Sequence, residues 1–281
     1  MQYNNRNNIP LYFYMTNKTS IHSTICTTGR MGFCVLFLMS SLFFVSCGAD
    51  RNIKKGDKFM SLGEYYYAAE QYKQAYRRTP PKDRDMRGKI SRKTALANDR
   101  INASAKAVAA YRNVIRYHQD DGNTHVCLAN NLMKQGLYRE AVKEYRLALD
   151  SASDNKEASM GLEAATEAPE LKREGSRYKV KKMEVFNSRR SDYSPMLFGD
   201  EYDQLYFTST RNEAQGDELS GITGQKPGDI FYSEKDDKGN WSRPQTIESG
   251  LNTEYDEGTP AFSPDGREMY ITQCTTDPSY P

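Results

Sequence analysis

The sequence has few of the residues and motifs from which catalytic and metal sites are usually built. Its 281 residues include three histidines, one tryptophan and five cysteines, and no two cysteines have the CxxC spacing of a metal site. It also lacks a glycine-rich phosphate loop and the GxSxG motif of serine hydrolases. We therefore expect a protein that is not an enzyme and that needs no cofactor.

Two polar clusters could still hold a metal ion, and neither is favoured. His118 and His125 flank a DDGNT segment, which is more typical of a polar loop in which Asp and Asn cap a helix. Asp217, Glu218 and Asp229 lie in an acid-rich stretch without the fixed DxDxDG spacing of a calcium loop. We expect a solvated loop there, and no metal site in the chain.

No apolar run is long enough for an ordinary membrane-spanning helix. The longest occupies residues 31–46, whereas a spanning helix needs roughly 20 residues. Lys18 and Arg30 precede it, as expected for a secretory signal. The run ends in VSCG, which resembles a bacterial lipobox and implies cleavage before Cys47 and acylation of its thiol. The alternative is an ordinary signal peptide with an incidental cysteine.

A net charge of +2 conceals two halves of opposite sign. Residues 51–174 contain 24 Lys and Arg against 17 Asp and Glu, a balance of +7. Residues 175–281 contain 12 against 19, a balance of −7. The basic half interleaves its cations with acids, as ordinary helix surfaces do, and we expect no nucleic-acid partner.

The segment GLYREAVKEYRLAL, residues 136–149, has the pattern of a helix that follows a turn. Gly136 suits the left-handed end of a preceding helix, and Tyr138 is expected in the turn. Ala141, Tyr145 and Ala148 then fall on one face of the next helix. The small residues allow a neighbouring helix to approach closely, and the tyrosine fills the space between them.

This pattern recurs along the chain. An earlier copy repeats the five positions without a shift, as Gly63, Tyr65, Ala68, Tyr72 and Ala75. A weaker middle copy has Ala107, Tyr111 and Val114 on the helix face, with Asn102 and Ser104 at the turn positions. The helix face repeats after 34 residues from Ala107 to Ala141 and after 39 from Ala68 to Ala107, which indicates an insertion of about five residues in a loop near PPKDRD.

A period of 34 with these small and aromatic positions resembles the tetratricopeptide repeat. Pro80 stands where that family places its terminal proline, and Gly56 and Phe59 match the small and aromatic positions of a first helix. Ala158, Leu162 and Ala165 are at helical spacing and predict a closing helix that caps the stack.

In tetratricopeptide arrays the first helix of each repeat lines a concave groove that binds an extended peptide or a partner helix. The resemblance implies a groove of mixed charge here, without a dominant carboxylate clamp. The alternative for each position is a solvated helix surface. The implied groove residues are Asp57, Met60, Arg92, Leu96, Asp99, Asn130 and Lys134.

The second half has the composition of short strands and turns. Residues 192–211 resemble residues 256–275, with Ser194-Pro195 aligned to Thr259-Pro260 at a spacing of 65. SPDG at residues 263–266 predicts a turn, because Pro264 sets the first central angle and Gly266 allows a positive φ. A hairpin tip is expected at residues 236–240, and Trp241 is expected to pack between strands.

These repeats resemble WD-like propeller repeats of the TolB type, in which a blade has four strands and a propeller four or more blades. The segment supplies about one blade and an opening hairpin. The predicted fold class is α+β multidomain, an α-helical solenoid followed by an incomplete β-propeller. The predicted domains are a signal peptide with an N-terminal extension (1–46), a lipidated linker (47–52), helical repeats (53–174) and a partial propeller (175–281).

The whole arrangement is similar to the OmpA-family lipoproteins of Bacteroidetes, including the PorE-type component of type IX secretion. The resemblance implies an outer-membrane scaffold, lipid-anchored on the periplasmic face, that binds other envelope proteins. Peptidoglycan binding would belong to a C-terminal domain not seen here, and we expect the chain to be a fragment, or an early-terminated copy, of a longer protein. The alternatives are a SusD-like glycan-capturing lipoprotein, or a non-catalytic part of a hydrolase that contains a propeller.

Overall fold

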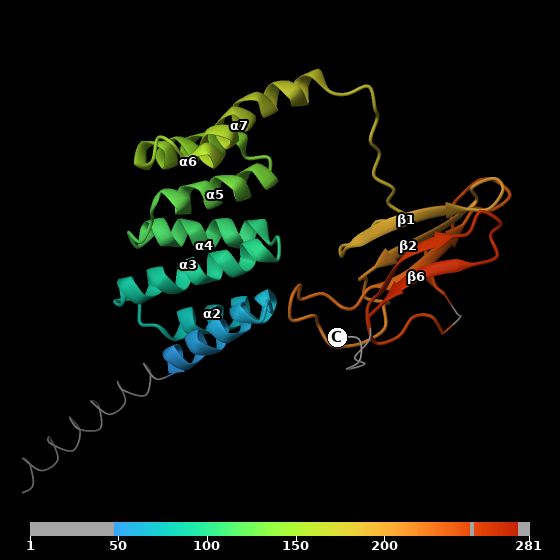
Figure 1. The fold of residues 1–281 in the computed structure, drawn as a ribbon, viewed down its shortest axis with the longest axis horizontal. Helices are drawn as coiled ribbons and strands as arrows, with labels where there is room; N and C mark the ends of the chain where they lie inside the picture. The colour runs from blue at the N-terminus through green and yellow to red at the C-terminus, as the bar shows by residue number, and fades with distance from the viewer. Residues whose placement is uncertain (1–47, 248–249, 275–281) are drawn as a thin grey trace, which may run out of the picture. The chain divides into compact units, whose positions relative to one another are not determined.

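The computed structural model describes residues 48–247 and 250–274, with helices first and strands second (Figure 1). Cys47 and the apolar run at 31–46 lie outside the described residues. The first described helix occupies residues 48–61. It is followed by α2 (Tyr65–Arg78), α3 (Arg84–Arg100), α4 (Ser104–Arg116), α5 (Gly122–Lys134), α6 (Tyr138–Ser151) and α7 (Lys156–Glu174). Among these described helices, none combines the length and the apolar character that a membrane crossing requires.

The helices form an array in which each packs against the one before it in the chain, from α2 to α7 (Figure 1). The small and aromatic positions predicted from the repeat are its core. All are at most 2% exposed to solvent: Ala68, Tyr72, Ala75, Ala107, Tyr111, Val114, Ala141, Tyr145 and Ala148. The predicted helix faces are therefore confirmed in all three copies.

The turns between paired helices confirm the register of the middle copy. Gly63 and Gly136 have φ values of 79° and 70°, the left-handed conformation that glycine adopts without a steric penalty. Asn102, at the matching place, has a φ of 56°, and Asn tolerates this region better than most residues. Tyr138 begins α6 instead of lying in the turn.

The predicted loop insertion near PPKDRD is wrong in kind, since the extra residues are helical. The loop at residues 79–83 is as long as the loop at residues 117–121. The five extra residues arise because α3 has 17 residues where α5 has 13, and α2 has 14 where α4 has 13. Asp83 stabilises the added first turn of α3 by accepting a hydrogen bond from the Met86 amide at 3.1 Å.

One end of the array agrees with the prediction from the sequence, and the other does not. The predicted closing helix is confirmed as α7, in which Ala158 and Ala165 are buried and Leu162 packs against them. At the other end, residues 48–52 belong to a helix, although the sequence assigned them to a linker after Cys47.

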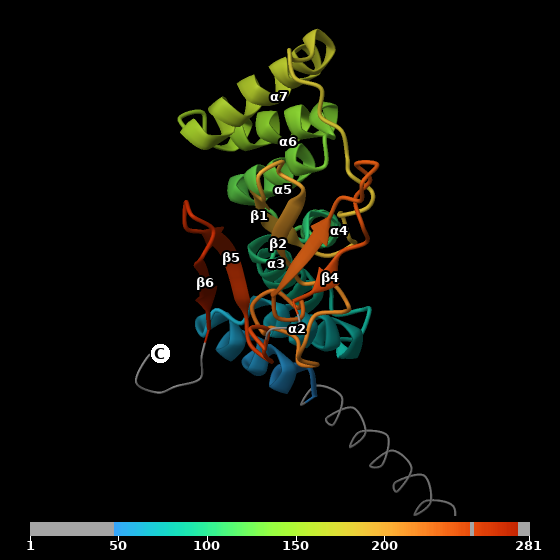
Figure 2. The same cartoon turned by 90° about the vertical axis from the view of Figure 1, so that its right-hand side faces the viewer.

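The strands form two antiparallel sheets. In the larger one the order is that of the chain, with β1 (Asp192–Phe198), β2 (Gln204–Ser209), β3 (Asp229–Glu234) and β4 (Gln245–Thr246). The smaller sheet is a hairpin of β5 (Glu257–Phe262) and β6 (Met269–Gln273), visible in Figure 2. Phe262 of this hairpin stacks on Phe198 of β1, with ring centroids 4.1 Å apart.

Both hairpins contain the same irregularity. The β1–β2 pairing shifts between Tyr193 and Met196, and the β5–β6 pairing shifts between Gly258 and Ala261, 65 residues later. Inside these bulges Ser194 and Thr259 have φ values of 50° and 51°. The internal repeat predicted from the sequence is therefore present in the backbone.

The predicted turns and aromatic packing of this half are also found. Gly266 in the SPDG turn has a φ of 68°. The amide of Asp236 donates to the Asn240 carbonyl and closes the hairpin tip. Trp241 packs edge-on against Phe186, with ring centroids 5.2 Å apart. The described chain is thus a tetratricopeptide-like helical array and small antiparallel sheets.

Candidate functional site

The buried tyrosines of the array fix which residues the first helices present. The Tyr72 hydroxyl donates to Asp57 at 2.7 Å, and the Tyr145 hydroxyl donates to Asn130 at 2.6 Å. In each case the acceptor precedes the tyrosine by 15 residues and belongs to the first helix of the same repeat. Asp57 and Asn130 therefore occupy matching places on one surface, here called the first-helix face.

Ion pairs and hydrogen bonds connect neighbouring first helices along this face. Lys93 of α3 lies 2.6 Å from Asp57, and Lys134 of α5 lies 3.1 Å from Asp99. Asn130 continues the series by donating to Glu157 of α7 at 2.8 Å. Four predicted groove residues therefore lie at junctions between two helices, namely Asp57, Asp99, Asn130 and Lys134.

Asp57 is ionised more readily than an ordinary aspartate despite its partial burial. Burial alone would raise its pKa, but hydrogen bonds from Lys93 and Tyr72 and the charge of Lys93 hold the pKa below the usual value. The Lys93 ammonium also lies 5.8 Å from the centre of the Tyr72 ring. Asp57 is therefore a fixed negative charge on the face at neutral pH.

The Arg92 side chain contacts the loop before α5 and is not free on the first-helix face. Its guanidinium lies 2.9 Å from Asp121 and also donates to the Gln119 carbonyl. Burial raises the pKa of Asp121, but hydrogen bonds from Thr124 and the Arg92 contact outweigh it and hold the pKa below its usual value. Arg92 thus stabilises a helix start, because Asp121 is the N-cap of α5.

A hollow of about 330 Å³ opens on the first-helix face between residues 48–61 and α3. Of the seven predicted groove residues, only Asp57 lines it. Met60 packs into the neighbouring core, while Leu96 is 39% exposed farther along α3. The lining residues are Asp50, Ile53, Lys54, Asp57, Met86, Lys89, Ile90 and Lys93.

Sequence reasoning did not identify Ile53, Lys89 or Ile90 as part of this hollow. Lys89 and Ile90 belong to the stretch of α3 close to its added first turn, where the register with the other first helices is least evident. The hollow combines apolar walls with paired charges. Such a surface can bind a polypeptide segment by inserting a side chain and exchanging hydrogen bonds.

The histidine cluster forms a network around one ring. His125 lies 2.7 Å from Glu144 through Nδ1 and 3.3 Å from Asp120 through Nε2, and His118 is exposed. The two carboxylates contact different nitrogens of the ring, and within residues 48–247 and 250–274 no group of three or more His, Cys, Asp or Glu side chains could hold a metal ion. The polar interpretation of the loop is supported by the capping box between Asp121 and Thr124.

The acidic stretch of the second half does not converge on one point. The Asp217 side chain extends into solvent, 3.9 Å from Lys226, whereas Asp229 is buried. One carboxylate oxygen of Asp229 accepts from the Gln215 amide at 2.8 Å, and the other has no hydrogen-bond partner among the residues that the structure describes. Burial raises the pKa of Asp229 to about 6, and the nearby charge of Glu257 adds to this increase.

Comparisons with known proteins give structural neighbours only. No protein-family model matches the chain, and no curated protein matches it. One similar solved structure is the first TPR of Spaghetti (RPAP3) bound to an HSP90 peptide, SRMEEVD. It is 20% identical, with 44% of this chain and 95% of that chain covered and a TM-score of 0.38.

A second similar structure is the Sgt2 TPR domain from Aspergillus fumigatus. It is 17% identical, with 48% of this chain and 87% of that chain covered and a TM-score of 0.37.

Proposed function

We propose that this chain is a protein-binding scaffold whose first-helix face receives an extended segment of a partner protein. The hollow beside Asp57 is the observation that carries the proposal. Ile53 and Ile90 provide apolar walls, and Lys89 and Lys93 provide hydrogen-bond donors at its edge. A segment with an apolar side chain and acceptor groups would fit this combination. The mechanism is recognition without turnover.

Exposed leucines on the array allow a site-specific test. Leu96 is 39% exposed on α3 of the first-helix face, and Leu147 is 46% exposed on α6, a second helix of its repeat. A photoreactive phenylalanine analogue would replace each leucine in turn in the full chain, within cells. We expect one crosslinked partner with the analogue at position 96 and none at position 147.

The partner would then be identified by mass spectrometry and tested against charge reversal at the hollow. Lys89→Glu should weaken its capture, because this lysine lines the hollow and its ion pair within the described residues is with the exposed side chain of Asp85. Equal crosslinking from both leucine positions would contradict the proposal, as would a partner whose capture does not depend on Lys89.

We also propose that the array is held at the outer membrane by acylation of Cys47, on the periplasmic face. The support is the sequence VSCG after a short apolar run with a positive flank. Several acyl chains on one cysteine would make the attachment firm. No acidic run follows Cys47 directly, which favours the periplasmic face over surface display.

The anchor is tested by metabolic labelling with palmitate. The wild-type chain should incorporate label and fractionate with the outer membrane, and Cys47→Ser should do neither. Equal labelling of the two chains would end the lipidation proposal. Protease added to intact cells would degrade a surface-displayed chain and spare a periplasmic one.

The order of signal, lipobox, helical repeats and strand repeats leads us to propose a role in an envelope complex similar to type IX secretion. The partner captured at position 96 would then be another envelope protein. A cytosolic partner would contradict this assignment without affecting the binding face itself.

A further inference from the structure

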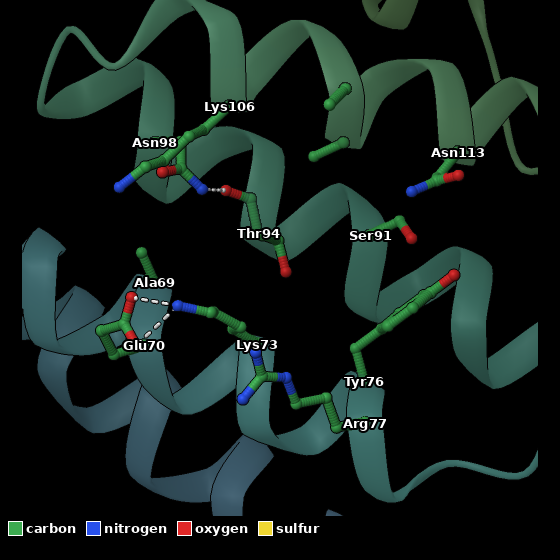
Figure 3. A pocket seen from close by; sticks show the side chains of 12 residues that line it. Ala69, Glu70, Lys73, Tyr76, Arg77, Ser91, Thr94, Asn98, Lys106 and Asn113 are labelled. Atoms are coloured by element: carbon green, nitrogen blue, oxygen red, sulfur yellow. Dashed lines mark hydrogen bonds and ion pairs between the residues drawn. The ribbon is translucent and has the colours of Figure 1, made fainter.

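A second cavity lies between the second helices α2 and α4, with α3 as its floor (Figure 3). Its volume is about 500 Å³. It is separate from the hollow beside Asp57, with which it shares no lining residue. Its lining residues are Ala69, Glu70, Lys73, Tyr76, Arg77, Ser91, Thr94, Asn98, Lys106, Ala109, Ala110 and Asn113.

The cavity exists because three floor positions carry small or polar residues. The repeat of 34 residues that relates Ala107 to Ala141 aligns Ser91, Thr94 and Asn98 with His125, Leu128 and Leu132. In α5 both leucines are 1% exposed and pack into the core between α4 and α6. The same places in α3 hold side chains too short or too polar to fill the corresponding space. The repeat that contains α3 thus has an opening at the place that leucines fill in the repeat that contains α5.

The floor offers hydrogen-bond acceptors. The hydroxyls of Ser91 and Thr94 each donate to a carbonyl of their own helix at 2.8 Å, so that their lone pairs remain available. The Asn98 amide nitrogen donates to the Thr94 carbonyl at 2.8 Å. Its amide oxygen accepts no side-chain or backbone donor from the described part of the chain. Such a floor suits the N–H groups of a polypeptide.

The rim is positively charged and partly unpaired. Lys73 lies 3.0 Å from Glu70, the one acidic residue of the lining, and Figure 3 shows this pair at the edge of the cavity. Arg77 and Lys106 line the cavity from α2 and α4, and neither forms an ion pair or a hydrogen bond within residues 48–247 and 250–274. Two cations are therefore available to carboxylates.

The walls between floor and rim are apolar. They consist of the Tyr76 ring and the methyl groups of Ala69, Ala109 and Ala110. The volume falls within the range of ligand pockets, roughly 300–1,000 Å³, and leaves room for a large side chain. An acceptor floor, apolar walls and a cationic rim together suit an acidic peptide that carries a large apolar side chain.

We propose that this cavity binds an acidic segment of a partner protein. A large apolar side chain of that segment inserts between α2 and α4, and flanking Asp or Glu residues contact Arg77 and Lys106. Its backbone N–H groups donate to the acceptors of the α3 floor. This site is independent of the first-helix face, so either can fail without the other.

The test selects ligands from a displayed library of random peptides on the full chain in mild detergent. Counter-selection uses the double variant Thr94→Leu/Asn98→Leu, which places the residues of α5 at the matching positions of α3. We expect the enriched peptides to carry an aromatic residue or leucine flanked by Asp or Glu. A representative synthetic peptide is then measured by fluorescence anisotropy against each variant.

The Thr94→Leu/Asn98→Leu double variant, here called the filled variant, should bind this peptide at least about tenfold more weakly. The Arg77→Glu/Lys106→Glu variant should do the same. The filled variant should also keep or raise its unfolding midpoint, which separates loss of binding from loss of fold. Lys89→Glu, on the first-helix face, should leave the affinity unchanged. Enrichment of neutral or basic peptides, equal binding to the filled variant, or failure to enrich any peptide would overturn the proposal.

Discussion

Single hydroxyl groups distinguish the three copies of the repeat. Tyr72 and Tyr145 donate to the residue 15 positions earlier, and the residue 15 positions before Tyr111 is Leu96. Within the described residues the buried Tyr111 hydroxyl consequently meets no oxygen or nitrogen partner, and the Cys127 thiol, a weak hydrogen-bonding group, is its polar neighbour. Burial raises the pKa of Tyr111 far above its ordinary value, so that the hydroxyl stays neutral.

Three Tyr→Phe substitutions should therefore have unequal effects. Tyr72→Phe and Tyr145→Phe each remove a made hydrogen bond and should lower the free energy of unfolding by about 1 kcal/mol. Tyr111→Phe removes a buried hydroxyl whose polar neighbour is only a thiol, and it should be neutral or stabilising. Urea denaturation of the helical signal in circular dichroism measures all three.

A double-mutant cycle supplies the control for this series. Leu96→Asn places an acceptor where the other copies have Asp57 and Asn130, and it should stabilise the chain only when Tyr111 keeps its hydroxyl. The interpretation is wrong if Leu96→Asn has the same effect in the Tyr111→Phe background.

The buried carboxyl of Asp229 predicts a dependence of stability on pH. Its pKa of about 6 in the fold exceeds the ordinary 3.8, so the folded chain binds the proton more tightly than the unfolded chain. The unfolding free energy should fall as pH rises from about 4 to about 6 and then level off. Asp229→Asn should be more stable than wild type above pH 6, by on the order of 2 kcal/mol.

That advantage should shrink as pH falls through the folded pKa. Trp241 is the sole tryptophan and packs in the sheet, so its fluorescence reports unfolding of this half. Asp217→Asn is the matched control, because that side chain extends into solvent and should leave the profile unchanged. A stability difference at position 229 that is the same at all pH values would contradict the assignment.

At the scale of helices and strands, the repeat period predicted the buried positions of the helices better than it predicted the cavities between them. The face formed by Ala141, Tyr145 and Ala148 could be predicted because close packing admits few residue types at those positions. The cavity over α3 could not, because Ser91, Thr94 and Asn98 appear unremarkable until they are aligned with α5. The bulges at Ser194 and Thr259 were missed because their backbone lies in a region that such residues seldom adopt.

The first hairpin depends on a buried ion pair that joins its two ends. Asp192 at the start of β1 lies 2.8 Å from Arg211 after β2, and both side chains are nearly inaccessible to solvent. The guanidinium lies over Phe207 and Phe231, 5.0 and 4.7 Å from the ring centres. Burial opposes ionisation of Asp192, but its hydrogen bonds from Ser209, Ser188 and Arg211 hold its pKa below the usual value.

Asp192→Ala should destabilise the sheet strongly, by about 3–5 kcal/mol, because it leaves a buried guanidinium without its countercharge. Adding Arg211→Met should recover part of the loss. The exposed pair of Glu213 and Arg243 offers a contrast, and Glu213→Ala should cost less than about 1 kcal/mol. Trp241 fluorescence during denaturation measures these effects, and similar losses from Asp192→Ala and Glu213→Ala would refute the argument.

For the whole molecule, the sequence predicted a boundary at residue 175 from a change in periodicity and charge. In the structure α7 ends at Glu174, β1 begins at Asp192, and Gly175 follows the helix with a φ of 71°. Residues 176–183 have neither helix nor strand, and their side chains are exposed. Each half has its own buried core, so the segment between them contributes little to either.

Limited trypsin digestion should therefore cut the chain first in this segment, where Arg177, Lys179, Lys181 and Lys182 are exposed. The array contains many more basic residues, but proteolysis there needs local unfolding of packed helices. The expected products are two fragments, identified by mass spectrometry, one ending within residues 177–182 and the other beginning within residues 178–183. A variant with all four residues changed to Gln should lose these early cuts. Early cleavage spread evenly over residues 51–174 would show that the helices do not form a stable unit, and both binding proposals on the array would fall with it.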